Sequence, residues 1–239
     1  MSGHSKWSTI KRKKGALDIQ RSKEFTRIAK EISIAAKYGT DVATNPRLRL
    51  AIQNAKTMNV PKANIEKAIN KSKMSKDNYS SVTYECNGVK NSTYIVECLT
   101  DNPTRTVNEI RLILSRGGGS LARSGSVSYN YEKKSFFEVE NNNIDPDDIL
   151  MKIIDYGGED VTSDEENVYI LGDDSKFGEL QSVIEECGLK IKSKRICYVP
   201  KNTVTLNDED EDKSVNLINN LECLDDVEYV YHNIDFAEK

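Results

Sequence analysis

Hydrophobic residues in the first third of the chain recur with the 3.6-residue period of an α-helix. The clearest stripe predicts a helix over residues 18–38, and its members are Phe25, Ile28, Ala29, Ile32 and Ala36. Asn45-Pro46 is typical of an N-cap followed by proline in the first turn, so it predicts a second helix. Pro61 opens a third helical pattern. These helices bury mostly alanine and isoleucine, so we expect a thin core that leans on its neighbours.

After an aperiodic linker at residues 71–81, the pattern changes to the alternation of β-strands. Asn87-Gly88 is a turn signal between two such strands, and Gly117-Gly118-Gly119 ends a helical pattern. We therefore expect strands at residues 82–85, 93–99 and 126–131, with a helix at 104–116.

Residues 135–200 show a β-α-β-β-α-β order, which is that of the ferredoxin-like split βαβ unit. After Pro200 the pattern predicts a strand at 203–206, a helix at 208–223 and a strand at 227–232. These last elements complete the unit begun at residue 82 if that domain is discontinuous. The expected fold is α+β, with a helical N-terminal domain (1–80), a discontinuous ferredoxin-like domain (81–133 plus 201–239) and a second ferredoxin-like domain inserted into it (134–200).

Charge is divided unevenly along the chain. The whole sequence of 239 residues carries a formal charge of −4. Residues 1–80 hold 18 Lys and Arg against 6 Asp and Glu, a net charge of +12, and the remaining residues carry −16. A basic third of this size indicates a polyanionic partner such as nucleic acid. The alternative is that these lysines only keep the exposed faces of the helices hydrated.

The candidate contact residues lie in a basic arm and on the polar faces of the first two helices. Lys11-Arg12-Lys13-Lys14 follows Trp7, whose ring either stacks on an exposed base or pins the arm to the helices. No helix shows the base-reading Asn or Gln side chains of a helix-turn-helix, so the sequence gives little support to sequence-specific DNA readout. It does not distinguish DNA from RNA as the ligand. The predicted nucleic-acid-binding residues are Lys6, Trp7, Lys11, Arg12, Lys13, Lys14, Arg21, Lys23, Arg27, Lys30, Arg47 and Arg49.

The sequence gives little sign of catalysis, so we expect no enzyme and no catalytic residues. The five cysteines are widely spaced and only two histidines are present, which argues against a metal site and favours reduced, buried thiols in a cytoplasmic protein. No nucleotide-binding motif predicts a cofactor. No apolar stretch suits a membrane span or a secretory signal. A metal-dependent nuclease using Asp101 and Glu109 is the remote alternative.

The acidic run at residues 208–212 has two interpretations. Asn207 precedes it as an N-cap, and acidic residues in a first turn suit the helix dipole. Alternatively, the run mimics a polyanion and competes for the basic arm. The sequence does not indicate an oligomeric state.

Several separated motifs, in order along essentially the whole chain, resemble the YebC/PmpR family. They are Gly3-His4-Ser5-Lys6-Trp7, Ile10-Lys11, Asn45-Pro46-Arg47-Leu48, Asn59-Val60-Pro61-Lys62, Leu99-Thr100-Asp101-Asn102 and Arg105-Thr106. The family is similar to the mitochondrial translational activator of cytochrome c oxidase. The resemblance implies a helical domain plus two α/β domains, the third inserted in the second. It also implies a cytoplasmic nucleic-acid-binding regulator without enzymatic activity. Bacterial members are described as DNA-binding transcription regulators, and others act on translation at the ribosome where synthesis stalls.

The sequence departs from the family pattern in two loops. Where the family usually has Gly-Gly-x-Asp-Pro after the first helix, this chain has Tyr38-Gly39-Thr40-Asp41-Val42. The usual glycine-rich turn near residue 86 is here Cys86-Asn87-Gly88-Val89-Lys90. The basic arm and first helix retain the pattern.

Overall fold

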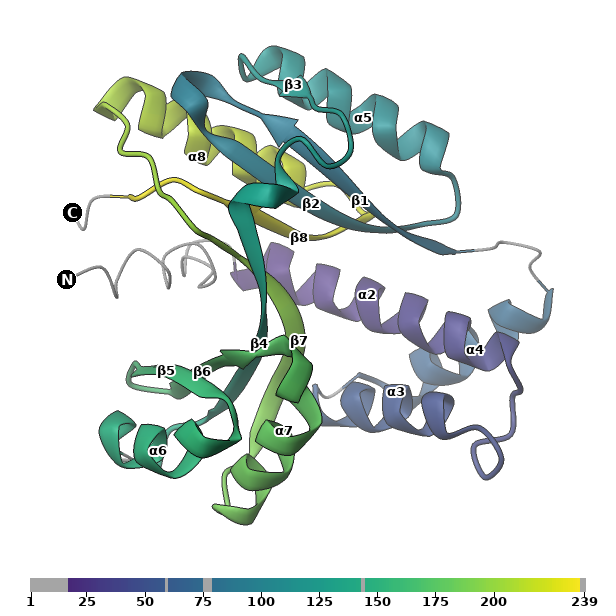
Figure 1. The fold of residues 1–239 in the computed structure, drawn as a ribbon. Helices are drawn as coiled ribbons and strands as arrows, with labels where there is room; N and C mark the ends of the chain where they lie inside the picture. Colours follow the sequence, from purple (N-terminus) through teal and green to yellow (C-terminus); the bar gives the residue numbers. More distant parts are fainter. Residues whose placement is uncertain (1–16, 59, 75–78, 143–144, 237–239) are drawn as a thin grey trace. The chain divides into compact units, whose positions relative to one another are not determined.

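The computed structural model describes residues 17–58, 60–74, 79–142 and 145–236. The chain forms two compact units, one of Met1–Ser128 with Thr203–Lys239 and the other of Tyr129–Asn202. Both contain helices and a four-stranded antiparallel sheet, so the predicted α+β class is confirmed (Figure 1). The sequence predicts an inserted domain of residues 134–200, and the second compact unit spans Tyr129–Asn202.

Three helices open the first unit: α2 (Leu17–Lys37), α3 (Pro46–Thr57) and α4 (Lys62–Met74). The Asn45 side chain accepts a hydrogen bond from the backbone N–H of Leu48 at 3.0 Å, and Pro46 lies in the first turn of α3, as the sequence predicts. The core of these helices is small-residue rich, as expected. Its buried members are Ile28, Ile32, Ala35, Ala36, Leu48, Ala51, Ala55, Val60, Ile65 and Ala68.

The sheet of the first unit has the strand order β3-β1-β2-β8. Its strands are β1 (Ser80–Asn87), β2 (Thr93–Thr100), β3 (Ser120–Leu121) and β8 (Val227–His232). Helices α5 (Pro103–Arg116) and α8 (Asp208–Glu222) cover one face (Figure 1). Ile110 and Leu114 of α5, Leu217 and Leu221 of α8 and Val96 of β2 share one buried core. The C-terminal strand therefore completes a sheet begun more than 100 residues earlier.

The second unit shows the predicted β-α-β-β-α-β order, and its strands lie in the order β5-β6-β4-β7. Phe137, Ile149, Ile153, Ile170 and Leu180 belong to the core between this sheet and its two helices. Short 3₁₀ turns, η3 (Ile154–Tyr156) and η4 (Asp174–Lys176), flank the helices. The elements of this unit are β4 (Tyr131–Glu140), α6 (Pro146–Ile153), β5 (Gly158–Ser163), β6 (Asn167–Asp173), α7 (Phe177–Glu186) and β7 (Ile191–Pro200).

Two predicted strands are wrong. Residues 126–130 form a turn and the 3₁₀ turn η2 (Ser128–Asn130), and β4 begins only at Tyr131. The reason is that the buried Glu85 carboxylate accepts the backbone N–H groups of Gly125, Val127 and Ser128, which a strand would offer to a neighbour. Residues 203–206 make only a single bridge, from Val204 to Ile234, because they meet the chain beyond the end of β8.

The glycine run and the acidic run have local structural roles. The first is the glycine run after α5, where Gly118 has a φ of +74° and the N–H of Gly119 returns to the carbonyl of Leu114 at 2.8 Å, ending the helix. The second is the acidic run of α8, which Asn207 caps by accepting the N–H of Asp210 at 2.8 Å. Both interpretations as helix ends are confirmed.

Candidate functional site

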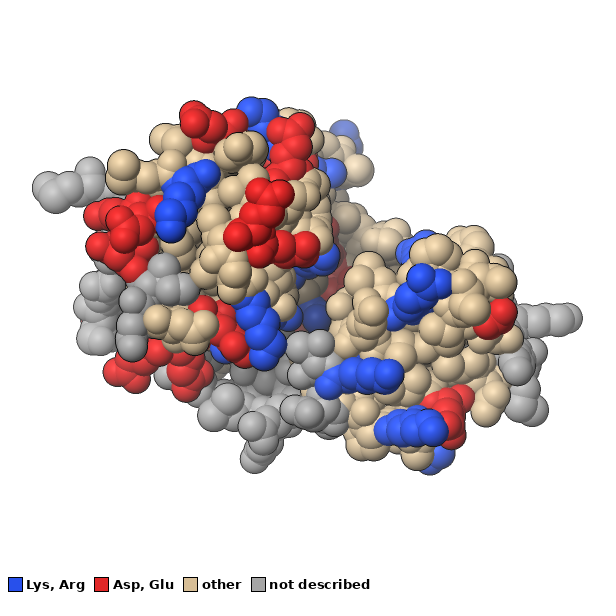
Figure 2. Space-filling model, turned by 90° about the horizontal axis from the view of Figure 1, so that it is seen from below, with Lys and Arg blue, Asp and Glu red and all other residues tan. Residues whose placement is uncertain are grey.

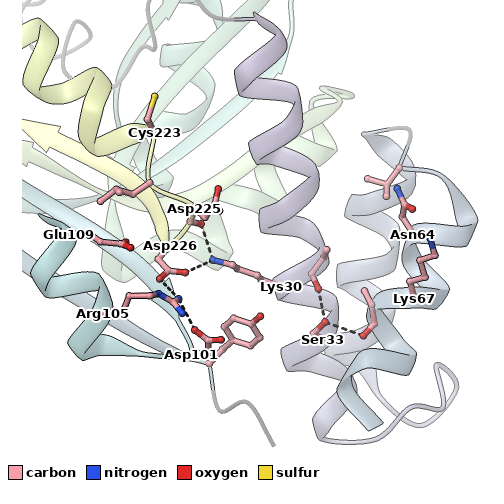
Figure 3. A pocket seen from close by; sticks show the side chains of 15 residues that line it. Lys30, Ser33, Asn64, Lys67, Asp101, Arg105, Glu109, Cys223, Asp225 and Asp226 are labelled. Carbon is pink, nitrogen blue, oxygen red and sulfur yellow. Dashed lines mark hydrogen bonds and ion pairs between the residues drawn. The ribbon is translucent and has the colours of Figure 1, made fainter. Parts of the chain in front are cut away.

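A pocket of about 830 Å³ opens within the first unit, between α2, α4, the start of α5 and the turn before β8 (Figure 3). Charged side chains of both signs line it. The cations are Lys30, Lys67 and Arg105, and the carboxylates are Asp101, Glu109, Asp225 and Asp226. Its character is therefore that of an ion-pair network rather than of a purely cationic site.

Asp226 is the centre of this network. Its Oδ1 accepts from Lys30 Nζ at 2.9 Å, and its Oδ2 accepts from Arg105 Nη2 at 2.8 Å (Figure 3). The same Oδ2 accepts the hydroxyl hydrogen bonds of Thr106 at 2.8 Å and Thr100 at 3.0 Å. The side chain is only 6% exposed, so these donors replace its water shell.

The electrostatics follow from this geometry. Burial alone raises the pKa of Asp226, but hydrogen bonds from Arg105, Lys30 and Thr106 outweigh it and hold the pKa at about 2. The hydrogen bonds to Asp226 and Asp101 raise the pKa of Arg105. Asp226 therefore stays ionised at any physiological pH.

Lys30 is fully occupied by this network. Its ammonium group also donates to the backbone carbonyls of Leu99 at 3.0 Å and Asp225 at 2.8 Å, which with Asp226 accounts for all three N–H bonds. The side chain is 12% exposed. The structure thus gives Lys30 an internal role.

Arg27, one turn earlier in α2, is half-buried. Its Nη1 donates to the Tyr229 hydroxyl, and its guanidinium lies 5.4 Å from the centroid of that ring. Arg27 therefore also joins α2 to β8.

Arg47 and Arg49 are exposed, as the nucleic-acid prediction requires of them. The Arg47 guanidinium lies over the Tyr38 ring, 5.6 Å from its centroid. Arg49 donates to the carbonyls of Val42 at 3.2 Å and Ala43 at 2.6 Å, and so braces the loop before α3. Three further exposed cations on α3 and α4 were not among the predicted contacts: Lys56, Lys62 and Lys67.

The remaining predicted contacts cannot be placed in this way. Arg21 and Lys23 lie in α2, but their side chains are outside the described residues. The basic arm, with Lys6, Trp7, Lys11, Arg12, Lys13 and Lys14, also lies outside them.

Over the helical part, basic side chains outnumber acidic ones on the face shown in Figure 2. In residues 27–70 the sequence has eight Lys and Arg against three Asp and Glu. The helical part therefore keeps its positive charge even without the arm.

Sequence reasoning missed Asp226, the most connected carboxylate of the pocket. A signal did exist, because Thr100, Asp101, Arg105 and Thr106 all belong to the motifs that carry the family resemblance. The structure shows that three of these four side chains hydrogen-bond to Asp226 directly.

All five cysteines are free thiols. Cys86, Cys98 and Cys197 are buried as expected, but Cys187 is half-buried and Cys223 is exposed because it ends α8 at the surface. Across the part of the chain that the structure describes, no group of three His, Cys, Asp or Glu could hold a metal ion. The helices of that part include none long and apolar enough to cross a membrane.

Comparisons with known proteins match the chain from end to end. Residues 5–75 match the N-terminal domain of the TACO1/YebC family model, and residues 79–234 match its second and third domain. A protein of Borrelia hermsii named "Probable transcriptional regulatory protein" is 43% identical over 244 residues, covering 100% of this chain and 99% of its own. A protein of Chlorobaculum tepidum with the same description is 43% identical over 242 residues, which cover 100% of this chain and 96% of the relative.

The crystal structure of a conserved hypothetical protein from Aquifex aeolicus superposes with a TM-score of 0.82 at 36% identity, covering 98% of both chains. Sequence and fold thus define a class of proteins that have an N-terminal domain followed by a second and a third domain. The chain belongs to the TACO1/YebC family, which confirms the resemblance, and its relatives' names describe transcriptional regulators.

Proposed function

We propose that this protein is a cytoplasmic regulator of gene expression that binds nucleic acid through its basic helical part. The observation that carries this proposal is the row of exposed cations on α3 and α4, in a chain whose relatives are named transcriptional regulators. Those cations are Arg47, Arg49, Lys56, Lys62 and Lys67.

The physical basis is phosphate neutralisation. Each Lys or Arg that contacts a phosphate releases condensed counterions, so the logarithm of affinity falls linearly with the logarithm of salt concentration. Engagement of about six cations on duplex gives a slope near −5. Phosphate contacts position the protein but carry no sequence information. We therefore propose binding in which shape and charge decide the affinity.

The same surface supports a second reading, a ribosome-associated translation factor that binds RNA. Binding without catalysis is part of our proposal, with a metal-dependent nuclease as its alternative. We also propose that residues 129–202 are a ferredoxin-like domain inserted into a discontinuous one. The strand order β5-β6-β4-β7 and the β-α-β-β-α-β connection support this arrangement.

The test is a binding titration of the full chain with labelled duplex DNA and single-stranded RNA at several salt concentrations. We expect the triple variant Arg47→Gln, Lys56→Gln, Lys62→Gln to bind more weakly and to flatten the salt slope by roughly one unit per lost contact. The control removes three exposed lysines of the other unit: Lys133→Gln, Lys190→Gln and Lys192→Gln. Equal losses in both variants, or no salt-dependent binding by the natural chain, would overturn the proposal.

Two further assays separate the alternatives. If the natural chain co-sediments with ribosomes and the triple variant does not, the protein is a ribosome-associated translation factor. Labelled RNA incubated with the protein and Mg²⁺ should remain whole, and fragments would identify a nuclease.

A further inference from the structure

Tyr38 is the most exposed aromatic side chain among the described residues, at 76%. It follows the last turn of α2, and the Arg47 guanidinium at the start of α3 lies over its ring. We propose that Tyr38 and Arg47 form a stacking site for an unpaired nucleobase. This inference rests on the proposed function and specifies its ligand as a single-stranded segment of nucleic acid.

The site is held in place by buried contacts. Asn45 is 6% exposed, and its side-chain amide donates to the carbonyl of Ala35 at 2.8 Å and to that of Gly39 at 2.6 Å. Its Oδ1 meanwhile caps α3 at Leu48. The end of α2 and the start of α3 are therefore fixed to each other. Because the ring and the guanidinium are arranged before a ligand arrives, little conformational entropy is lost on binding.

The neighbouring side chains suit a nucleotide. Leu50 and Asn54 lie three and seven residues after Arg47, on adjoining positions of one helix face. Leu50 is 46% exposed and offers an apolar contact, while the exposed Asn54 amide can both donate to and accept from a base edge. While the base stacks at this site, the Arg47 guanidinium can contact the phosphate of the same nucleotide.

Charge favours nucleic acid over a protein partner. Arg47 and Arg49 lie at this corner. The one carboxylate of the loop, the exposed Asp41, is engaged locally, since it accepts the N–H of Ala43 at 2.9 Å and the Thr44 hydroxyl hydrogen bond at 3.3 Å. An exposed aromatic ring beside cations stacks on any base, because every base has a π-face.

The geometry distinguishes single strands from duplex. In a duplex both faces of an internal base are covered by its neighbours, so Tyr38 can stack only on an unpaired base.

The experiment measures binding of the full chain to a 12-nucleotide oligo(A) RNA, its DNA counterpart and a 12-base-pair duplex at fixed salt. We expect Tyr38→Ala to weaken binding of single strands roughly 5- to 100-fold and to leave duplex binding within about twofold. Tyr38→Phe and Tyr38→Trp should retain single-strand affinity because they retain the ring. The salt slope should not change, since no charge is lost. Tyr129→Ala, which removes a ring that is 65% exposed elsewhere, is the matched control and should bind normally.

The outcomes separate this inference from the proposed function. If the natural chain binds both forms and Tyr38→Ala binds single strands equally well, the stacking site is wrong while the proposed function stands. A loss of duplex binding as large as the single-strand loss also overturns the site. If the natural chain binds none of the three probes, the proposed function itself fails. A loss confined to RNA, or shared with single-stranded DNA, supports the site and identifies which strand it accepts.

Discussion

The ammonium nitrogen of Lys30 lies 2.9 Å from Oδ1 of Asp226, a residue 196 positions further along the chain. The two side chains are 12% and 6% exposed, so this ion pair is largely removed from water. It joins the longest basic helix, α2, to the turn that leads into the C-terminal strand. A charge placed this deeply is tolerable only while its partner remains, because an unpaired buried ion loses its hydration without compensation.

Asp226→Asn should therefore destabilise the protein strongly. The substitution keeps the shape of the side chain but leaves Lys30 without a counter-charge, and breaking a buried pair costs roughly 3–5 kcal/mol. Chemical denaturation followed by circular dichroism measures the loss. The neighbouring Asp225→Asn removes the same charge from an exposed side chain and should change the free energy of unfolding by less than about 0.5 kcal/mol. Similar values for the two variants would contradict the role of Asp226.

The same carboxylate should make the protein sensitive to acid. Its pKa is about 2 in the folded chain, below its ordinary value of 3.8. A lowered pKa contributes stability that is present above pH 4 and is lost as the pH falls towards 2. We expect the difference in unfolding free energy between the natural chain and Asp226→Asn to shrink by roughly 2 kcal/mol between pH 5 and pH 2. Parallel stability curves for the two proteins across that range would show that Asp226 is not the titrating group.

Glu85 should control the loop before η2. Its carboxylate is 7% exposed and accepts three backbone N–H groups, at 2.6 Å from Gly125, 2.5 Å from Val127 and 2.9 Å from Ser128. Although burial raises the pKa of Glu85, the hydrogen bonds prevail and lower it overall.

Glu85→Gln replaces one acceptor oxygen with a donor that faces these N–H groups, so we expect a loss of roughly 2–4 kcal/mol. Hydrogen exchange should speed up at the amides of residues 125, 127 and 128. Glu179→Gln, an exposed acid of α7, should leave these amides protected. Unchanged protection in Glu85→Gln would refute this account of the loop.

The sequence predicted local structure well and long-range structure poorly. The N-cap at Asn45 was predicted because the cap residue, the proline and the apolar stripe lie close together in the sequence, and that at Asn207 because acidic residues fill the first turn after it. The strand predicted at 126–131 failed because Glu85, 40 residues away, takes its hydrogen bonds. Alternation of side chains cannot reveal a competing acceptor from another part of the chain.

The candidate site shows the same limit. Helical periodicity correctly places Lys30 away from the apolar stripe of α2, which for an isolated helix means exposure to water. The sheet that covers Lys30 is brought there by tertiary packing, and the carboxylate that receives it comes from the turn before β8. Tyr38 stands out only once its exposure and its contact with Arg47 are known.

Close packing at Gly119 should make this position intolerant of any side chain. A Cβ there would lie 2.6 Å from the backbone carbonyl oxygen of Asn87, which cannot move without disturbing the β1 pairing. We expect Gly119→Ala to lower the melting temperature by several degrees, which corresponds to a loss of about 1–3 kcal/mol. Gly178→Ala in α7 meets nothing within 4 Å and should stabilise the protein by up to about 1 kcal/mol, since alanine favours helix. Equal effects at both glycines would show that contact with Asn87 is not the cause.

The five thiols should differ sharply in reactivity. Burial, followed by the nearby Glu85 charge, raises the pKa of Cys86 to about 12, and burial likewise raises that of Cys98. A thiol must ionise and be reached before it reacts with a disulfide reagent. At pH 8 we therefore expect a fast phase from the exposed Cys223 and a slower one from the half-buried Cys187, with the other three reacting only in denaturant. Cys223→Ser should abolish the fast phase. A different outcome is that the fast phase survives this substitution, or that more than two thiols react without denaturant. Either result would mean that the cores around Cys86, Cys98 and Cys197 open far more readily than the burial of these residues implies.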